Sequence, residues 1–310
     1  MTREDALPPE WLPPMLATLG EEATTPAAWP VEPKWDGVRV LAVLHPVLGI
    51  RLWSRNETDL TLTFPDVAVE LAQRARGFGI LDGEVVAGAP GTMGEFGRLQ
   101  QRLGRRLPSP ELVTGVPVAY HVFDVLWWDG RDRRALPWTA RRELLATTLE
   151  FGGRIRKTPA WRSRRRERLE ALCATGGEGL VAKRPDAPYQ GARSRDWVKL
   201  KCHRQGNFVV GGWTAPEGTR IGVGALLIGR REAGELCYVG RVGTGFSDAE
   251  LARTESRLAT LERSRSPFTN PPRRPTARWV DPVLTCRVRY AEWTNDQKLR
   301  HPSFLGWVGD

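Results

Sequence analysis

The chain has 310 residues, a length that predicts two domains or one large domain with an appendage. Its 41% hydrophobic and 26% charged residues exclude a disordered or fibrous protein. Lys and Arg number 46 against 36 Asp and Glu, and the resulting net charge of +10 favours a polyanionic partner. The chain shows neither a signal-peptide pattern nor an apolar run of about 18 residues, so we expect a cytoplasmic protein without a membrane span.

The first part of the chain is predicted to mix strands and helices. In chain order, we expect an extended Pro-rich arm (8–33), strands 38–44 and 50–54 with a turn at Gly49, a helix near 67–72, strands 80–86 and 118–126, a helix over 164–174, and strands 179–183 and 197–201. This pattern is typical of an α+β domain.

After Gly206 the sequence changes to short strands joined by Gly-rich turns, as in a small β-barrel. The predicted elements are strands 208–213, 225–229 and 236–242, a helix from a Ser247/Glu250 capping box to about Arg263, and a strand pair within 279–290. We place the domain boundary between residues 204 and 205, so that an α+β domain (1–204) precedes a barrel domain (205–310).

The cysteines are widely spaced along the chain, at Cys173, Cys202, Cys237 and Cys286. No two of them have the close spacing of a zinc site, and a cytoplasmic protein seldom forms disulfides. We therefore expect four reduced thiols.

Lysine is rare, with six Lys against forty Arg, so each Lys indicates a position that needs a primary amine. Lys199 and Lys201 alternate along one predicted strand and point to the same face. Two ammonium groups on one face repel each other unless an anion such as phosphate lies between them. A solvated edge strand that uses Lys to prevent aggregation remains an equally good reading.

The segment from Glu32 to Arg39 contains a second lysine pattern, Lys34-Trp35-Asp36-Gly37. A lysine amine is nucleophilic only when it is neutral, and nearby cations, a metal or burial favour that form. Asp36 supplies a carboxylate, Gly37 permits close backbone approach, and Arg39 can bind an anion. This short pattern also arises by chance, so its meaning depends on the rest of the chain.

A dense basic run extends from Arg154 to Arg168. Two readings remain open for it, a solvated helix face and a contact with the DNA backbone.

Six segments, in order, resemble the ATP-dependent DNA ligases of the nucleotidyltransferase superfamily, most closely the bacterial LigC/LigD type. The segments are Lys34-Trp35-Asp36-Gly37-Val38-Arg39, Ser54-Arg55-Asn56, Leu81-Asp82-Gly83-Glu84, Tyr120-His121-Val122-Phe123-Asp124, Glu178-Gly179-Leu180-Val181-Ala182-Lys183 and Trp197-Val198-Lys199-Leu200-Lys201. The resemblance implies an ATP-grasp-like nucleotidyltransferase (adenylation) domain followed by an OB-fold domain. It also implies that ATP and Mg²⁺ or Mn²⁺ are cofactors, and that Lys34 carries AMP while nicked DNA is sealed.

The resemblance also implies a role for each motif residue. Lys34, Asp36, Lys199 and Lys201 would be catalytic, with the last two on the α-phosphate. Nucleotide binding would involve Glu32, Arg39, Arg55, Glu84, Phe123 stacked on adenine, Lys183, and Arg300 on the leaving pyrophosphate. Glu84 and Glu178 would hold the metal. The barrel would close over the nucleotide about a hinge at 203–207.

The terminal motif of the family continues after Phe304 with a further Arg and then Asp-Lys, whereas this sequence has Val308 at that Arg position. Self-adenylation therefore depends on Arg300 and Lys298 or is weakened. The resemblance further suggests a nucleoid-associated bacterial monomer, with a Ku-like end-binding protein and a separate repair polymerase as partners. The alternatives are an RNA ligase, a capping-type nucleotidyltransferase, or a DNA-end-binding protein with impaired adenylation. End joining and excision repair both stay open.

Overall fold

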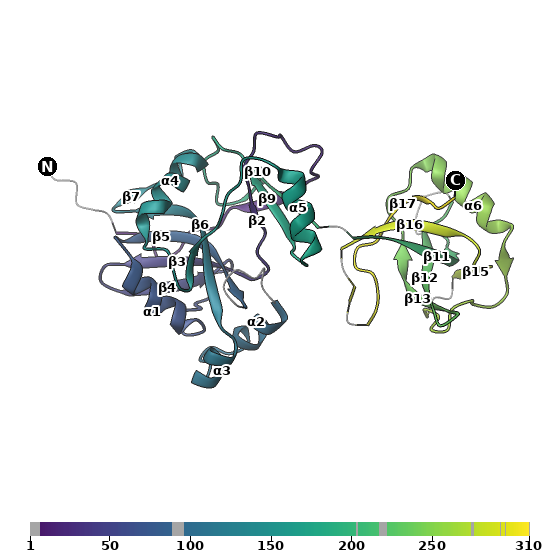
Figure 1. Ribbon diagram of the computed structural model, residues 1–310, viewed down its shortest axis with the longest axis horizontal. Helices are drawn as coiled ribbons and strands as arrows, with labels where there is room; N and C mark the ends of the chain where they lie inside the picture. The colour runs from purple at the N-terminus through teal and green to yellow at the C-terminus, as the bar shows by residue number, and fades with distance from the viewer. Residues whose placement is uncertain are drawn as a thin grey trace. The chain divides into compact units, whose positions relative to one another are not determined.

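The structure is a computed structural model of the chain, and it describes residues 7–88, 96–202, 204–216, 222–273, 276–291, 293–294 and 296–309. The chain divides into two compact units, Met1–Cys202 and His203–Asp310. Figure 1 draws the first from purple to teal and the second from green to yellow. His203, which belongs to the expected hinge, lies outside the described residues. No helix in the described ranges is long and apolar enough to cross a bilayer.

One sheet of the first unit has the strand order β4-β3-β5-β6-β7, with β8 paired to β6. Its strands are β3 (Val38–His45), β4 (Gly49–Ser54), β5 (Gly79–Ala87), β6 (Val118–Trp128), β7 (Arg131–Asp132) and β8 (Ile155–Lys157). β5 and β6 are buried on both faces, since Val85 and Val122 belong to one core cluster while Ile80 and Phe123 belong to another. The predicted strands of this region are confirmed.

The helices of this region are α1 (Pro65–Arg74), α2 (Phe96–Leu103), α3 (Pro110–Gly115) and α4 (Trp138–Thr148). Of these, α1, α2 and α4 pack on the sheet just described. α1, which was predicted, starts with a proline that suits the first helical turn, and it buries Val67 and Leu71. The other three were not predicted. In α4 the charged Arg141 is buried beside Leu145, and this interrupts the apolar pattern that would have indicated a helix.

Another sheet has the order β1-β10-β9-β2. Its strands are β1 (Leu16–Leu19), β2 (Val31–Pro33), β9 (Gly179–Lys183) and β10 (Arg193–Lys201). The Pro-rich arm thus contributes β1 and β2. β9 runs antiparallel to both of its neighbours, and its residues Gly179 and Leu180 pair with Lys201 and Pro33. The start of β9 therefore lies beside the ends of β10 and β2.

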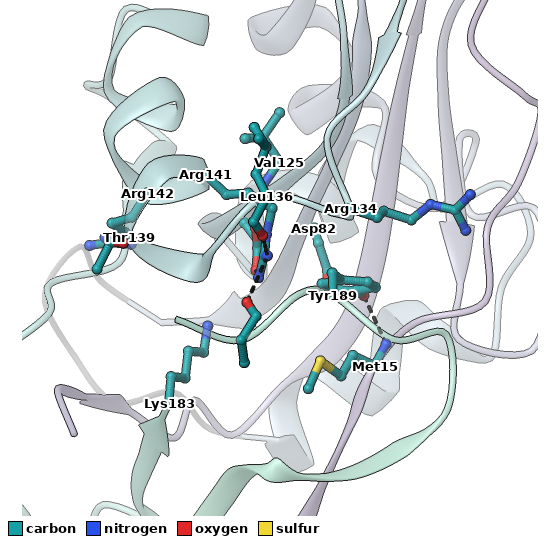
Figure 2. A network of polar contacts seen from close by, with 12 residues as sticks. Met15, Asp82, Val125, Arg134, Leu136, Thr139, Arg141, Arg142, Lys183 and Tyr189 are labelled. Atoms are coloured by element: carbon teal, nitrogen blue, oxygen red, sulfur yellow. Dashed lines mark hydrogen bonds and ion pairs between the residues drawn. The ribbon is translucent and has the colours of Figure 1, made fainter. Parts of the chain in front are cut away.

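Tyr189, in the connection between β9 and β10, links the two sheets. Its hydroxyl donates a hydrogen bond to Oδ2 of the buried Asp82 on β5, at 2.6 Å. The same hydroxyl accepts a hydrogen bond from the backbone N–H of Met15, just before β1, at 2.9 Å (Figure 2). A single side chain thus holds the edge of one sheet against the middle of the other.

The second unit is a sheet with the order β13-β12-β11-β15-β14, in which β16 pairs with β11 and β17. Its strands are β11 (Arg204–Thr214), β12 (Ala225–Glu232), β13 (Glu235–Val242), β14 (Glu262–Arg263), β15 (Ala277–Val280), β16 (Thr285–Tyr290) and β17 (Ser303–Trp307). Hydrogen bonds from Leu299 N to Val239 O (2.7 Å) and from Phe304 N to Thr244 O (2.9 Å) join the last segment to the β13 side. The predicted barrel is confirmed, although β17 was not predicted.

The helix of the second unit, α6 (Asp248–Ala259), has the predicted capping box between Ser247 and Glu250. The expected end at Arg263 is wrong. The helix stops at Ala259 because Glu262 and Arg263 form β14 and pair with Val280 and Trp279 of β15.

The expectation of four reduced thiols is also wrong, because Cys173 and Cys202 form a disulfide with their Cα atoms 5.3 Å apart. Cys173 lies in α5 (Arg165–Ala174), which leads into β9, and Cys202 follows the last residue of β10. The backbone N–H of Cys202 also donates to Glu178 O at 3.0 Å. Strand pairing thus brings together two cysteines whose spacing in the sequence indicates no bond. Cys237 and Cys286 are free thiols.

Removing this disulfide is expected to lower the free energy of unfolding of the first unit by about 2–4 kcal/mol, because the cross-link restricts the unfolded chain. The double variant Cys173→Ser, Cys202→Ser would show the loss in urea denaturation, and reductant should have the same effect on the wild type. Cys237→Ser is the matched control and should leave the midpoint unchanged. If reductant leaves the wild-type midpoint unchanged and the double variant unfolds at that same midpoint, the cross-link contributes nothing to stability.

Candidate active site

A cavity of about 420 Å³ in the first unit has walls from both of its sheets. The predicted site residues in these walls are Glu32, Lys34, Arg39, Arg55, Glu84, Phe123, Lys183 and Lys199. Among the described residues predicted for the site, Asp36, Glu178 and Lys201 are not part of the wall, and Arg300 belongs to the second unit. The fold therefore brings most of the motif residues of the first unit around one space.

Lys34 is held by a carboxylate just outside this wall. Its Nζ donates a hydrogen bond to Oε2 of Glu178, and Nζ of Lys201 lies 3.6 Å from Oε1 of the same side chain. Glu178 immediately precedes β9, whereas Lys34 follows β2 and Lys201 ends β10. The antiparallel pairing of β9 with both neighbours explains why residues 144 positions apart in the sequence meet here.

Gly37 lies against β5 with no room for a side chain. A Cβ added there would lie 2.2 Å from the carbonyl oxygen of Val85 and 3.1 Å from Cγ of Glu84. The close backbone approach that the sequence predicts for Gly37 is therefore present, and the approach brings the segment that carries Lys34 against the strand that carries Glu84.

We expect Gly37→Ala to destabilise the first unit by about 1–3 kcal/mol, because the backbone of β5 must move to accept the methyl group. Lys34 is the predicted nucleophile, so we expect its displacement by about 1 Å to slow AMP transfer by roughly 10²-fold. The control is Gly97→Ala in α2, where an added Cβ meets no atom within 4 Å. Denaturation and the rate of AMP transfer measure the two effects, and equal behaviour of the two variants would contradict the prediction.

Two carboxylates alternate on β5, and their surroundings differ. Asp82 accepts hydrogen bonds from Nε (2.5 Å) and Nη2 (2.6 Å) of Arg39. Glu84 pairs directly opposite Arg39 in the strand register. Burial raises the pKa of the Glu84 carboxyl to about 7, although Arg39 and Lys34 act in the opposite direction. Asp82 is thus fully engaged by Arg39. Glu84 instead lines the cavity, where Arg39 and Lys34 offset only part of the effect of burial on its carboxylate.

An aromatic pair and a buried ion pair form another part of the wall. Nζ of Lys183 lies 4.4 Å from the ring centre of Phe123 and 4.0 Å from that of Trp197. The same Nζ is 2.6 Å from Oε2 of Glu32, and both side chains are almost fully buried. Burial raises the pKa of Glu32 and lowers that of Lys183, so each charge depends on its partner. The two ring planes meet at 80°, so each ring offers the cavity its own apolar surface, of a kind that suits a nucleotide base.

The cavity wall near Lys199 is strongly positive. Burial lowers the pKa of the Lys199 amine, and the neighbouring cations Lys201 and Arg193 lower it further. Sequence reasoning missed Arg193, which lines the cavity from the start of β10. Every second residue of a strand points to the same face, so counting back from Lys201 and Lys199 through Trp197 reaches Arg193. This alternation could have identified Arg193 as a cavity residue from the sequence. β10 lies between β1 and β9, so the edge-strand reading of Lys199 and Lys201 is wrong. Like charges so close together favour an anion, and its binding here stays a prediction.

The basic run divides into two groups in the structure. Arg165 donates to the carbonyl oxygens of Pro26 (2.8 Å) and Thr25 (2.8 Å), and Arg168 stacks on Trp161 at 4.5 Å. Arg165 thus holds the segment before β2 to α5, whereas Arg168 packs on the chain that leads into α5. Other members, such as Arg164, are exposed to solvent.

The residues expected to act from the second unit lie near its C-terminal segment. Arg300 is exposed, and Nζ of Lys298 donates to the carbonyl oxygen of Tyr238 at 2.5 Å. Lys298 thus has a structural partner within its own unit. Val308, at the expected Arg position, donates its backbone N–H to Thr285 O at 2.9 Å.

Comparisons with known proteins agree with this geometry. Residues 14–201 match the family model "ATP dependent DNA ligase domain", and residues 219–310 match "ATP dependent DNA ligase C terminal region". LigD of Mycolicibacterium smegmatis, named a multifunctional non-homologous end joining protein, is 37% identical over 96% of this chain and 38% of its own length. This chain thus spans little more than a third of that relative.

Solved structures show the same likeness. The ligase domain of M. tuberculosis LigD is 34% identical with a TM-score of 0.53, covering 96% of this chain and 94% of that one. A mycobacterial DNA ligase D complexed with ATP and MES is also 34% identical, with a TM-score of 0.52 over 96% of this chain and 95% of that one. The motifs, the two-unit fold and these matches together show that the chain belongs to the ATP-dependent DNA ligases, with an adenylation domain followed by an OB-fold domain.

Proposed function

We propose that this chain seals nicks in double-stranded DNA, joining a 5′-phosphate to a 3′-hydroxyl through AMP bound covalently to Lys34. The observation that carries the proposal is the position of Lys34. It lies on a cavity that has an aromatic wall of Phe123 and Trp197, and the cations Lys199 and Arg193 also line that cavity. A base, a phosphate and an amine nucleophile can thus be held together in one space.

The reaction proceeds in three displacements at phosphorus. The neutral amine of Lys34 attacks the α-phosphorus of ATP, a P–N bond forms, and pyrophosphate leaves with the electron pair of the broken P–O bond. The 5′-phosphate of the nick then attacks the same phosphorus and releases Lys34. Finally the 3′-hydroxyl attacks the 5′-phosphate, AMP leaves, and the strand is continuous.

The other motif residues position the nucleotide. Phe123 stacks on adenine, Glu32 and Lys183 line the cavity beside that ring, and Lys199 and Lys201 bind the α-phosphate. Arg55 and Arg39 bind phosphate or ribose, although Asp82 already holds the guanidinium of Arg39. Asp36 acts beside Lys34. Arg300, from the second unit, orients the leaving pyrophosphate.

The carboxylates fit a divalent cation. The described residues hold no cluster of three or more His, Cys, Asp or Glu able to bind a metal. Two carboxylates are nevertheless enough, because Mg²⁺ is usually bound by one or two carboxylates together with substrate phosphates and water. Glu84 and Glu178 would supply these two carboxylates. An Mg²⁺ or Mn²⁺ ion bound there would neutralise the charge of the phosphates. Glu178 also accepts a hydrogen bond from Nζ of Lys34, which keeps that amine at the cavity.

The family matches favour this reading over an RNA ligase, a capping-type enzyme or a catalytically impaired end-binding protein. The similar LigD proteins are named for non-homologous end joining, which supports a role of this chain in end joining. The proposed form of the enzyme is a monomer that acts on nucleoid DNA. A Ku-like end-binding protein and a separate repair polymerase are the partners we propose.

The test is to incubate the protein with α-labelled ATP and Mg²⁺ or Mn²⁺, and then to look for label on the denatured chain. The protein is first treated with pyrophosphate, which removes any AMP already bound to it. We expect label from ATP, transfer of that label to the 5′ end of a nicked duplex, and sealing. Absence of label with both metals would overturn the proposal, and sealing of an RNA nick in preference to a DNA nick would favour the alternative.

A further inference from the structure

The segment that carries Lys34 has neighbours on both of its sides. On one side is β9, since the backbone N–H of Lys34 donates to Gly179 O at 2.8 Å. On the other side is the chain that follows β8, since Val31 at the start of β2 exchanges two backbone hydrogen bonds of 2.8 Å with Trp161. The predicted nucleophile therefore lies between two lengths of backbone, and the contacts on both sides bear on where its amine points.

Trp35, the residue after Lys34, contacts the second of these neighbours. Its indole N–H donates a hydrogen bond to the hydroxyl oxygen of Thr158 at 3.1 Å. Its ring stacks on the imidazole of His121, with the ring centres 3.8 Å apart and the planes inclined by 27°. Burial and the charge of Arg156 lower the pKa of His121 to about 4, so both rings are uncharged at neutral pH. Trp35 is thus held at its edge by Thr158 and on its face by His121.

Thr158 is itself firmly held, although it follows the last residue of β8. Its side chain is fully buried. Its backbone N–H donates to Val122 O on β6 at 2.8 Å, and its carbonyl oxygen accepts a hydrogen bond from Nη2 of Arg142 on α4. The hydroxyl that Trp35 contacts is therefore anchored to β6 and α4, which belong to other parts of the unit than β2.

The contacts of Trp35 connect the cavity to residues outside it. Of these described residues, Lys34 and Trp35 line the nucleotide cavity, whereas Thr158 and His121 do not. Any effect of Thr158 on the reaction would therefore pass through Trp35. The peptide bond that joins Lys34 to Trp35 is planar, so a fixed Trp35 also restricts the backbone from which the amine of Lys34 projects.

We propose that Thr158 is a positioning residue for the adenylation step: its hydroxyl holds Trp35 against His121, and Trp35 in turn directs the amine of Lys34 toward the α-phosphate. The inference rests on the proposed function and adds to it a residue outside the nucleotide cavity. A nucleophile displaced by about 1 Å can lose about 10²-fold in rate. Loss of the Thr158 hydroxyl should therefore slow the chemical step and leave ATP binding intact.

The test compares AMP transfer from α-labelled ATP in Thr158→Val and in the wild type over a range of ATP concentrations. Valine keeps the branched shape of threonine and removes the acceptor. We expect the maximal rate to fall about tenfold or more, while the ATP concentration that gives half of that rate stays unchanged. Thr158→Ser keeps the hydroxyl and should recover most of the rate. Thr148→Val is the matched control, because Thr148 is equally buried but its hydroxyl donates to Leu145 O within α4.

Two further measurements separate positioning from a general loss of structure. Trp35→Phe keeps an aromatic ring on His121 and removes the N–H, so it should slow AMP transfer as much as Thr158→Val does. The double variant should be no slower than either single one, because both changes remove the same hydrogen bond. A nicked duplex that already carries AMP does not need the amine of Lys34, so Thr158→Val should seal it at the wild-type rate.

The possible outcomes distinguish this inference from the proposed function. A wild type that takes no label contradicts the proposed function and this inference with it. A labelled wild type whose maximal rate is matched by Thr158→Val contradicts this inference alone. An equal loss in Thr158→Ser or Thr148→Val, a raised ATP requirement at an unchanged maximal rate, or slower sealing of the adenylated nick would overturn it too. Urea denaturation reports whether each variant is folded.

Discussion

Replacing Lys34 with arginine is expected to abolish transfer of AMP from ATP to the protein. Arginine keeps the positive charge and can still bond to Glu178, but its guanidinium stays protonated and offers no nucleophilic nitrogen. Loss of a nucleophile typically costs more than about 10⁴-fold in rate. Label from α-labelled ATP on the denatured variant measures the effect, and label at the wild-type level would show that another residue carries AMP.

The same variant separates the first step from the last. A nicked duplex that already carries AMP on its 5′-phosphate does not need the amine of Lys34, so Lys34→Arg should still seal it. Lys157→Arg, a conservative change at a lysine outside the nucleotide cavity, is the control and should adenylate normally. If Lys34→Arg fails on both substrates while its thermal unfolding is unchanged, Lys34 has a role in the final step as well.

The largest effect on stability is expected at the buried pair of Arg141 and Asp124, which are both fully buried. Arg141 donates to Asp124 through Nε (2.7 Å) and Nη2 (3.0 Å), and to the carbonyl oxygens of Leu136 and Ala187. Arg141→Met leaves the carboxylate without a partner in the core. We expect a loss of about 3–5 kcal/mol in the free energy of unfolding of the first unit.

Arg134→Met is the matched control, since Arg134 pairs with Asp132 through Nη2 at 2.7 Å but both side chains are about one third or more exposed. Exposed pairs contribute less than about 1 kcal/mol. Urea denaturation of both variants gives the comparison. The double variant Arg141→Met, Asp124→Leu should recover much of the loss, because no charge is then left unpaired. Equal losses in the Arg134 and Arg141 variants would show that burial of the pair is unimportant.

Local patterns predicted most of the strands well. The alternation in 38–44 and 50–54, with Gly49 at φ +75° in the turn, leaves little freedom, and β3 and β4 form as expected. Six motifs in order were sufficient to predict the fold, because each resembles a known segment of the family.

Contacts between distant segments could not be predicted in the same way. The bond between Lys34 and Glu178 and the disulfide between Cys173 and Cys202 both depend on how β9 pairs with its neighbours. α4 was missed because its inward face carries Arg141, whose charge is balanced only by a residue on another element. Such features belong to the packed sheets and have no signature in a single stretch of sequence.

Tyr189 has a consequence for how this protein tolerates change. The connection at 184–192 joins two strands and would ordinarily admit insertions, but its tyrosine is buried and bonded to both sheets. An added residue there would separate the walls of the nucleotide cavity. The turn at 46–48 is exposed, so sequence drift and engineered tags should be accepted there and rejected near Tyr189.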